Sequence, residues 1–297
     1  MTRLEEMGAL AKQAARKLAV AGSQKDKALE AIADALIAHT QEILAANGED
    51  LDAARANGMS QSLLDRLALN EKRIQGMAQG VRQVAAQPDP VGQVLEGSLR
   101  PNGLRIEKVS VPLGVVGMIY EARPNVTADA AALCLKAGNA VILRGGKEAF
   151  RSNRAIAQVM RQAVESAGLP ADSIQLVEDT SRASSVEMMG LTGYLDVLIP
   201  RGGAGLIRTV VENSRVPVIE TGVGNCHVYV DDAADTDMAV NIIFNAKTSR
   251  PSVCNAIETV LVHKDAAQRV LPAVKAKLDE KQVEIRGCER TCQILSG

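Results

Sequence analysis

The chain has 297 residues, of which 46% are hydrophobic and 2% aromatic, and its 34 lysines and arginines nearly balance 35 aspartates and glutamates. This length and hydrophobic content predict a large core, divided between two domains. A formal net charge of -1 gives no basic excess for nucleic acid or for an acidic membrane surface, and the lack of Trp argues against a base-stacking platform. We therefore expect neither nucleic acid nor a membrane as a partner.

Targeting signals, metal sites and disulfides are not expected either. The N-terminus carries Glu5 and Glu6 and lacks the apolar segment of a secretory signal. The longest apolar stretch, residues 109–120, is broken by proline and glycine and is too short to span a bilayer. The five cysteines form no CxxC pair, and the three histidines are far apart, so there is no zinc pattern. Cys288 and Cys292 are four residues apart, but packing explains them better than a redox pair. A cytoplasmic protein with reduced thiols is expected.

The first part of the chain favours helices. Apolar residues recur at helical spacing through residues 25–46, and a second helical stretch covers about residues 70–86. Asn-Gly pairs at residues 47–48 and 57–58 are expected to interrupt the helices. Residues 88–90, Pro-Asp-Pro, end this helical part.

The middle of the chain alternates between strand-like and helix-like segments. Asn102-Gly103 between alternating residues predicts a hairpin that protrudes near residues 98–110. The alternation that follows predicts a parallel, doubly wound sheet with right-handed crossovers, which binds ligands at the carboxyl ends of its strands. The predicted strands are residues 115–119, 140–143, 173–177, 195–199 and 216–220, and the helices are about 126–136, 149–167, 184–189 and from 204 onward.

A new α/β pattern starts after Gly224. Strands are predicted at residues 227–230, 256–262 and 283–285, with helices at 234–246 and 266–278 between them. We therefore place the domain boundary between the segments 1–225 and 226–297. The chain stops soon after the last predicted strand, so the second domain is expected to be incomplete.

Two glycine-rich turns follow strands of the predicted sheet. One is Arg144-Gly145-Gly146-Lys147, and the other is Pro200-Arg-Gly202-Gly203, which opens a helix whose first amides could face an anion. Taken singly, each is better explained as a tight turn that needs the backbone freedom of glycine. Together, at the same end of adjacent strands, they favour a nucleotide. Neither a GxGxxG fingerprint nor a P-loop is present.

Three further residues are candidates for chemistry. Asn125 follows the first strand of the sheet, where its amide either donates to an oxyanion or caps the next helix. Glu220 ends the fifth predicted strand, as a general base or as a solvated turn residue. Cys254 lies in a loop, where Lys247 and Arg250 favour a nucleophilic thiolate, although most single cysteines are small core residues. A thiol hydrolase or transferase is a weaker interpretation, because no histidine sits in a partner motif.

Three longer motifs occur together in the chain: Tyr120-Glu-Ala-Arg-Pro-Asn-Val-Thr127, Glu220-Thr-Gly-Val-Gly-Asn-Cys-His-Val-Tyr-Val230 and Ser249-Arg-Pro-Ser-Val-Cys-Asn255. They resemble the aldehyde dehydrogenase superfamily and, within it, the γ-glutamyl phosphate reductases, also called glutamate-5-semialdehyde dehydrogenases. The resemblance covers the whole chain. It implies a Rossmann-like, doubly wound NADP-binding domain and a second, incomplete α/β catalytic domain. Because the family extends well beyond Gly297, a C-terminally truncated chain is expected. A noncatalytic fragment that keeps the fold and nucleotide binding is the alternative.

The resemblance also implies a reaction. It is the NADPH-dependent reduction of L-glutamyl 5-phosphate to L-glutamate 5-semialdehyde in proline biosynthesis, with release of phosphate, through a thioester on Cys254. Asn125 and the backbone amide of Cys254 would form the oxyanion hole. In aldehyde-oxidising relatives the position of Glu220 activates water, so in a reductase this side chain is expected to turn away or to organise phosphate.

The remaining implied roles concern the cofactor, the substrate and the partners. Arg144 stands where many superfamily members have a cofactor-binding lysine, and Arg144 or Lys147 is expected to contact the 2′-phosphate of NADPH. A homo-oligomer is implied for the full-length form, and the instability of the acyl phosphate suggests hand-over from glutamate 5-kinase. The other residues expected around the cofactor are Gly145, Gly146, Pro200, Gly202 and Gly203, and the cations proposed for the substrate phosphate or α-carboxylate are Arg123, Lys247 and Arg250.

Overall fold

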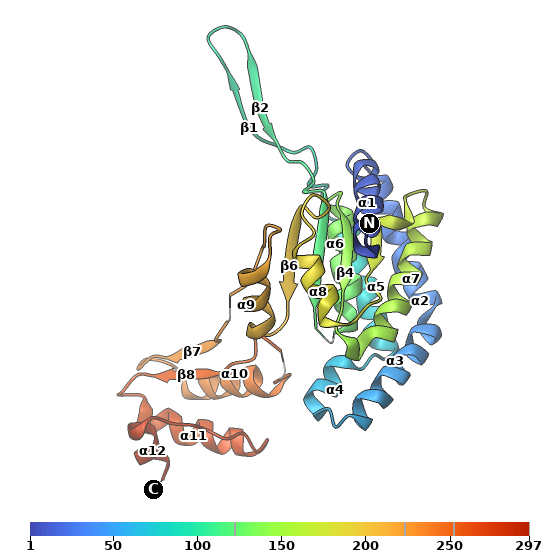
Figure 1. The fold of residues 1–297 in the computed structure, drawn as a ribbon. Helices are drawn as coiled ribbons and strands as arrows, with labels where there is room; N and C mark the ends of the chain where they lie inside the picture. Colours follow the sequence, from blue (N-terminus) through green and yellow to red (C-terminus); the bar gives the residue numbers. More distant parts are fainter. Residues whose placement is uncertain (122, 223, 252, 297) are drawn as a thin grey trace. The chain divides into compact units, whose positions relative to one another are not determined.

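The computed structural model describes residues 1–121, 123–222, 224–251 and 253–296. The chain divides into two compact units, Met1–Thr221 and Gly222–Gly297 (Figure 1). The first unit contains a four-stranded sheet and a hairpin, and the second contains a pair of strands. Within the described ranges, no helix has both the length and the apolar character needed to cross a membrane.

The first 85 residues are mainly helical, and the interruption predicted at Asn47-Gly48 is wrong. The helix α3 runs straight through Asn47-Gly48, where an interruption was expected. Asn47 is buried, and its Nδ2 donates to Leu67 O at 2.9 Å while its Oδ1 accepts from Leu69 N–H at 2.7 Å. The asparagine therefore links helices instead of turning the chain. The helices are α1 (Arg3–Leu18), α2 (Gln24–Ala38), α3 (Thr40–Ala56), α4 (Gln61–Leu67) and α5 (Glu71–Ala85).

A parallel sheet forms the core of the first unit, as the alternating pattern predicts. Its strands lie in the order β5-β4-β3-β6 and are largely buried. The helices α6 and α7 pack on the strands, and α2 and α5 form a further layer over these helices (Figure 1). The strands are β3 (Val115–Tyr120), β4 (Ala140–Arg144), β5 (Ile174–Leu176) and β6 (Val197–Arg201), and the helices are α6 (Pro124–Lys136), α7 (Phe150–Ser166), α8 (Arg182–Met189) and α9 (Ala204–Asn213).

The fifth strand predicted for this sheet, at residues 216–220, is reduced to a single bridge between Leu198 and Val218. The N–H of Leu198 donates to Pro217 O at 2.8 Å, and the N–H of Ile219 donates to Leu198 O at 3.0 Å. Pro217 has no N–H to continue a ladder. The prediction of a full strand is therefore wrong, and the chain leaves the sheet before Glu220.

A hairpin of the first unit stands clear of the sheet (Figure 1). Its strands β1 (Val94–Leu99) and β2 (Arg105–Val109) are antiparallel, and every one of their residues is exposed. The Asn102-Gly103 pair sits at the turn, where Gly103 has a φ of +85°, a conformation that favours glycine. A two-stranded hairpin of this kind has little stability of its own in water.

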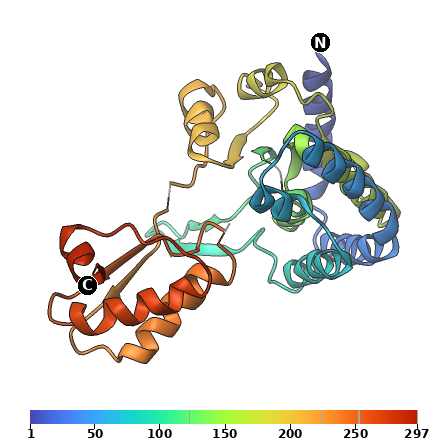
Figure 2. The same ribbon diagram turned by 90° about the horizontal axis from the view of Figure 1, so that it is seen from below.

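The second unit builds its own small core. Its parallel strands β7 (His227–Val230) and β8 (Thr259–Val262) pack with α10 (Thr236–Thr248) and α11 (Ala267–Asp279), which lie side by side (Figure 2). The strand predicted at residues 283–285 does not form. Val283 and Ile285 do pack on this core, but as irregular chain, because no described strand pairs with them. The helix α12 (Glu289–Leu295) was not predicted.

Candidate active site

The carboxyl ends of three strands meet at one edge of the four-stranded sheet. The parallel register pairs Ile119 of β3 with Arg144 of β4, and Tyr120 of β3 with Arg201 of β6. The segments that leave these strands therefore start beside one another. The structure thus brings together most residues that the sequence singles out in the first unit: Arg123, Asn125, Arg144, Gly145, Gly146, Lys147, Pro200, Gly202 and Gly203.

Arg144 ends β4 and is engaged with the protein itself. Its Nη2 donates to the carbonyl oxygens of Thr180 and Ser181 at 2.7 and 2.8 Å, and its Nη1 donates to Gly145 O at 3.2 Å. Partial burial lowers the pKa of the guanidinium, and the nearby Asp179 and Glu148 oppose this effect. Arg144 therefore holds the loop between β5 and α8.

Gly145 allows a close approach of main chain to buried polar side chains. A Cβ at this position would overlap the Asn153 amide and lie 3.1 Å from the Tyr120 ring. The hydroxyls of Tyr120 and Thr127 are 2.7 Å apart, and Thr127 Oγ1 donates to Asn153 Oδ1 at 3.0 Å. Burial raises the pKa of Tyr120, so its hydroxyl keeps its proton. This network fixes the side chains beneath the carboxyl ends of β3 and β4. We call the edge where the carboxyl ends of β3, β4 and β6 meet the strand-end edge.

Lys147 is a cation that is available at this edge. It begins a short 3-10 helix at Lys147–Ala149, with Gly146 as the preceding cap residue. Its side chain is exposed, and its ammonium has no hydrogen bond or ion pair among the described residues. In contrast to Arg144, Lys147 is free to meet an anion.

The N-terminus of α9 already faces an anionic group of the same chain. Pro200 is buried in β6, and Gly202 and Gly203 follow at the start of the helix. A Cβ on Gly202 would lie 2.7 Å from the Glu121 side chain. The N–H of Gly203 donates to Glu121 Oε2 at 3.0 Å. A carboxylate thus sits where the amides at a helix start favour an anion.

Asn125 is an exposed residue in the first turn of α6. It is not the cap of that helix, because Arg123 occupies the cap position and Pro124 the first helical position. Asn125 Nδ2 donates to Asp129 Oδ2 at 2.9 Å, one helical turn further on. The half-buried Arg123 donates its N–H to Glu121 O at 2.7 Å. The capping interpretation of Asn125 is therefore wrong, and its amide is accessible.

Glu220 lies beyond the Val218 bridge, near the end of the first unit. Its side chain is exposed and has no hydrogen-bond or ion-pair partner among the described residues. The side chain of Glu220 is therefore solvated in this structure.

Cys254 belongs to the second unit, in the loop between α10 and β8, and its side chain is exposed. The loop is anchored just after it, because Ala256 and Ile257 are buried and the N–H of Ile257 donates to Ala246 O at 3.1 Å. On the other side, Cys226 Sγ donates to the carbonyl oxygen of Cys254 at 3.5 Å. An exposed thiol is thus carried on a loop with a fixed end.

The two cations near Cys254 differ from each other. Lys247 is half-buried, and its Nζ donates to Ile257 O at 3.1 Å, so it helps to anchor the loop. Arg250 is exposed, and its side chain makes no hydrogen bond or ion pair within the described part of the chain, which leaves its guanidinium free for an anion. Of the two, Arg250 is the better candidate for a substrate contact.

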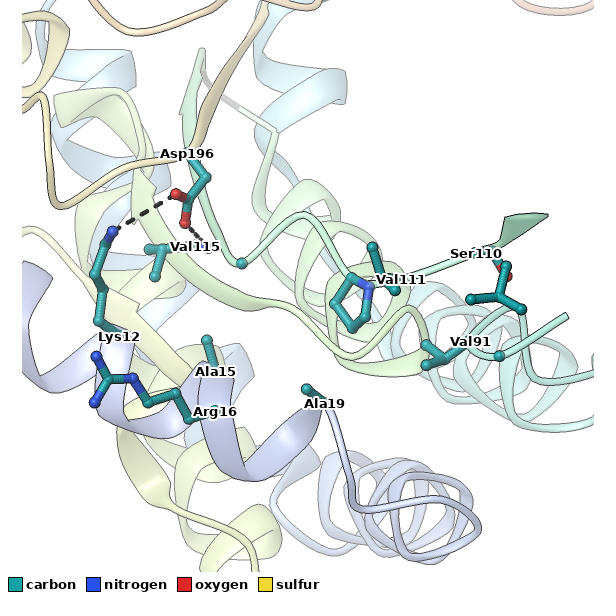
Figure 3. Close-up of a pocket in the computed structure, with 13 residues that line it drawn as sticks. Lys12, Ala15, Arg16, Ala19, Val91, Ser110, Val111, Val115 and Asp196 are labelled. Atoms are coloured by element: carbon teal, nitrogen blue, oxygen red, sulfur yellow. Dashed lines mark hydrogen bonds and ion pairs between the residues drawn. The ribbon is translucent and has the colours of Figure 1, made fainter. Parts of the chain in front are cut away.

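A cavity of about 520 Å³ lies at the opposite end of the sheet, where β3 begins (Figure 3). Its wall is mostly apolar and includes Val111 and Val115. Lys12 Nζ lies 3.6 Å from Asp196 Oδ1, and Asp196 Oδ2 accepts from the Val115 N–H at 2.8 Å. None of the predicted site residues lines this cavity, so the carboxyl-end edge remains the candidate site.

Two residues that contact the predicted ones, one in each unit, were missed at the level of sequence. Glu121 directly follows β3, and Cys226 lies within the motif that spans residues 220–230. Their positions after a strand and inside a motif were signals, but only the folded structure shows their contacts with Gly203 and Cys254.

Comparisons with known proteins agree with this fold and with the motifs. The model of the "Aldehyde dehydrogenase family" matches residues 3–293. A "Gamma-glutamyl phosphate reductase" of Heliobacterium modesticaldum is 59% identical over 297 residues, which are 100% of this chain and 71% of the relative. One of Moorella thermoacetica is 60% identical over 293 residues, 98% of this chain and 70% of the relative. The crystal structure of a γ-glutamyl phosphate reductase from Thermotoga maritima superimposes with a TM-score of 0.90 at 46% identity, covering 99% of this chain and 72% of that one.

The chain therefore belongs to the aldehyde dehydrogenase family. Within that family, it is similar over its whole length to proteins named γ-glutamyl phosphate reductase, and it spans about 70% of their length.

Proposed function

We propose that this chain carries the catalytic cysteine of a reductase that converts L-glutamyl 5-phosphate to L-glutamate 5-semialdehyde and phosphate in cytoplasmic proline biosynthesis, with NADPH as the reductant. The observation that supports it most is the exposed thiol of Cys254 on its anchored loop, in a chain 59% identical to a γ-glutamyl phosphate reductase.

In the first step, the Cys254 thiolate attacks the acyl carbon of the substrate. A sulfur–carbon bond forms, the bond from that carbon to the phosphate oxygen breaks, and phosphate leaves. The product on the protein is a thioester, which accepts a hydride more readily than a carboxylate or an oxygen ester. No histidine base is needed when the sulfur is already a thiolate.

The second role is stabilisation of negative charge on the carbonyl oxygen. This charge develops when sulfur attacks and again when the thioester is reduced, so one oxyanion hole serves both steps. The exposed amide of Asn125 and the backbone N–H of Cys254 are the donors in this proposal. Asn125 now donates to Asp129, and it would exchange this partner for the substrate oxygen.

The strand-end edge has features that fit a dinucleotide. The exposed Lys147 is suited to the 2′-phosphate, and a phosphate at the start of α9 would take the Gly203 N–H over from Glu121. Arg144 is the weaker candidate because its guanidinium holds the 180–181 carbonyls. When bound, NADPH supplies the hydride that reduces the thioester.

The residues proposed to contact the substrate are chosen for their positive charge, because the substrate carries anionic groups. The exposed Arg250 is proposed for the phosphate or α-carboxylate, with Arg123 and Lys247 as further candidates. Glu220 has no polar partner among the described residues and is proposed to leave the thioester intact, since activation of water would waste it. A homo-oligomer in the full-length form, and hand-over of the unstable acyl phosphate from glutamate 5-kinase, complete the proposal.

The test is the reverse reaction, followed as NADP⁺ reduction in the presence of L-glutamate 5-semialdehyde and phosphate. We expect turnover that depends on phosphate and disappears in Cys254→Ala, on this chain or on a chain extended past Gly297 to the length of its relatives. Nucleotide binding without turnover in both chains would instead support the alternative of a noncatalytic, nucleotide-binding protein.

A further inference from the structure

The thiol of Cys226 lies beside the main chain of the proposed nucleophile. Cys226 Sγ donates to the carbonyl oxygen of Cys254 at 3.5 Å. The carbonyl oxygen of Cys226 accepts the N–H groups of Glu258 and Thr259 at 3.0 and 3.1 Å. Three contacts thus join residue 226 to the loop of Cys254, although the two cysteines are 28 positions apart in the sequence.

The same loop is held from its other side, which limits how far the two cysteines can separate. Ile257 N–H donates to Ala246 O, and Lys247 Nζ donates to Ile257 O, both at 3.1 Å. Thr259 Oγ1 is also 3.1 Å from Asn225 Oδ1, next to Cys226. The sulfur of Cys226 thus already contacts the main chain of residue 254, beside the side chain that it would have to reach.

Access to solvent favours Cys254, because its side chain is exposed while Cys134 is half-buried, as Cys226 is. Cys254 is exposed and Cys226 is half-buried, so a small oxidant can reach them. Burial raises the pKa of Cys134 to about 12 and keeps that thiol protonated. Cys288 and Cys292 form a separate group at the start of α12, where Cys288 Sγ is 3.4 Å from Thr291 Oγ1.

We propose that Cys226 and Cys254 form a disulfide when the protein meets hydrogen peroxide, and that this bond reversibly blocks the nucleophile and protects it from further oxidation. The regulatory meaning rests on the proposed function, whereas the bond itself does not. Cys226 then acts as the resolving cysteine of the site.

The chemistry needs peroxide alone as the oxidant. The Cys254 thiolate attacks one peroxide oxygen, so a sulfur–oxygen bond forms, the oxygen–oxygen bond breaks, and the departing hydroxide takes a proton to become water. The Cys226 sulfur then attacks the sulfenic sulfur of Cys254. The sulfur–sulfur bond forms, the sulfur–oxygen bond breaks, and a second water leaves. Two thiols are oxidised by two electrons, and one peroxide is reduced to two waters.

The experiment is a peptide map of the whole chain after brief exposure to hydrogen peroxide, with free thiols alkylated before digestion without a reductant. We expect two of the five thiols to be lost and a crosslinked peptide pair that contains Cys226 and Cys254. Dithiothreitol should restore both thiols, together with any turnover lost on oxidation.

The controls separate this bond from other oxidation. In Cys226→Ser, Cys254 should pass to sulfinic acid, which dithiothreitol does not reverse. In Cys288→Ser, the Cys226–Cys254 crosslink should form as before. Oxidised Cys254 beside a free Cys226 in the unmutated chain, or a crosslink found only between Cys288 and Cys292, would overturn the proposal. A crosslink in a chain that shows no turnover when untreated would count against the proposed function alone.

Discussion

The strand-end edge of the first unit and the Cys254 loop of the second unit hold their functional groups in different ways. At the edge, buried parallel strands fix the main chain, and several polar groups already have partners, as Arg144 has in Thr180 and Glu121 has in Gly203. In the loop, the reactive group is exposed and only the flanking residues are anchored. The edge is thus suited to holding a ligand in a fixed place, and the loop is suited to presenting a group that must form and break bonds.

The largest effect is expected at Cys254. If the loop carries the chemistry, Cys254→Ala should lower kcat by roughly 10³-fold or more, because no other group replaces the nucleophile. NADPH binding, followed by the fluorescence of the nucleotide, should be retained. Glu220→Gln is the matched comparison, and we expect a far smaller loss for this solvated residue. Equal losses in the two variants would remove the distinction between them.

A smaller loss of kcat is expected when Asn125 is replaced. This residue belongs to the strand-end edge and is proposed to take part in the chemistry. Asn125→Ala should lower kcat by about 10²–10³-fold, the usual cost of removing one oxyanion donor. Asp129→Ala is the control, since it breaks the same Asn125–Asp129 hydrogen bond but keeps the amide. If both variants lose activity equally, Asn125 acts through the structure of α6 and does not contact the substrate.

The rigidity of the edge can be measured at Gly145. Gly145→Ala places a Cβ against Asn153 and Tyr120 and should cost about 1–3 kcal/mol of unfolding free energy, as overpacking does. Gly205→Ala, in α9, meets no atom within 4 Å and should be neutral or stabilising by up to about 1 kcal/mol. Urea titrations of the two variants compare them directly. Similar free energies of unfolding would show that Asn153 and Tyr120 move aside at little cost when a Cβ is added at position 145.

The smallest effect concerns the contact between Glu121 and the start of α9. Glu121→Gln keeps a hydrogen-bond acceptor for the Gly203 N–H but removes the negative charge from the place proposed for nucleotide phosphate. NADPH should bind about 2–5-fold more tightly, as expected for a charge effect of about 0.3–1 kcal/mol at a helix end. Glu187→Gln, which makes the same change of charge on α8, should leave the dissociation constant unchanged. Weaker NADPH binding in Glu121→Gln would mean that the carboxylate helps to hold the nucleotide.

Local patterns in the sequence predict the sheet well, because its strands are short apolar runs separated by helical repeats and glycine turns. These patterns fail where contacts between residues distant in the sequence determine the local structure. Asn47 continues a helix because its side chain bonds Leu67 and Leu69, and Val218 forms only a bridge because Pro217 offers no donor. The apolar alternation of residues 283–285 resembles a strand but packs as irregular chain.

The candidate site shows the same division. The positions of Asn125 and of the two glycine turns follow from their place after strands, and the exposed Cys254 follows from its loop. The hydrogen bonds of Arg144, Glu121 and Cys226 join residues far apart in the sequence. Arg144 and Thr180 are separated by 36 positions, and Glu121 and Gly203 by 82. No local pattern carries that information.

The central claim is that Cys254 forms a thioester during the reaction. The most direct measurement is the intact mass and peptide map of the protein after mixing with L-glutamate 5-semialdehyde and NADP⁺ without phosphate, so that the acyl group is not released to phosphate. We expect one glutamyl group on Cys254, removed by added phosphate or hydroxylamine and absent from Cys254→Ala. Reduction of NADP⁺ in a phosphate-dependent reaction that leaves Cys254 unmodified at every time, or an acyl group on another residue, would contradict it.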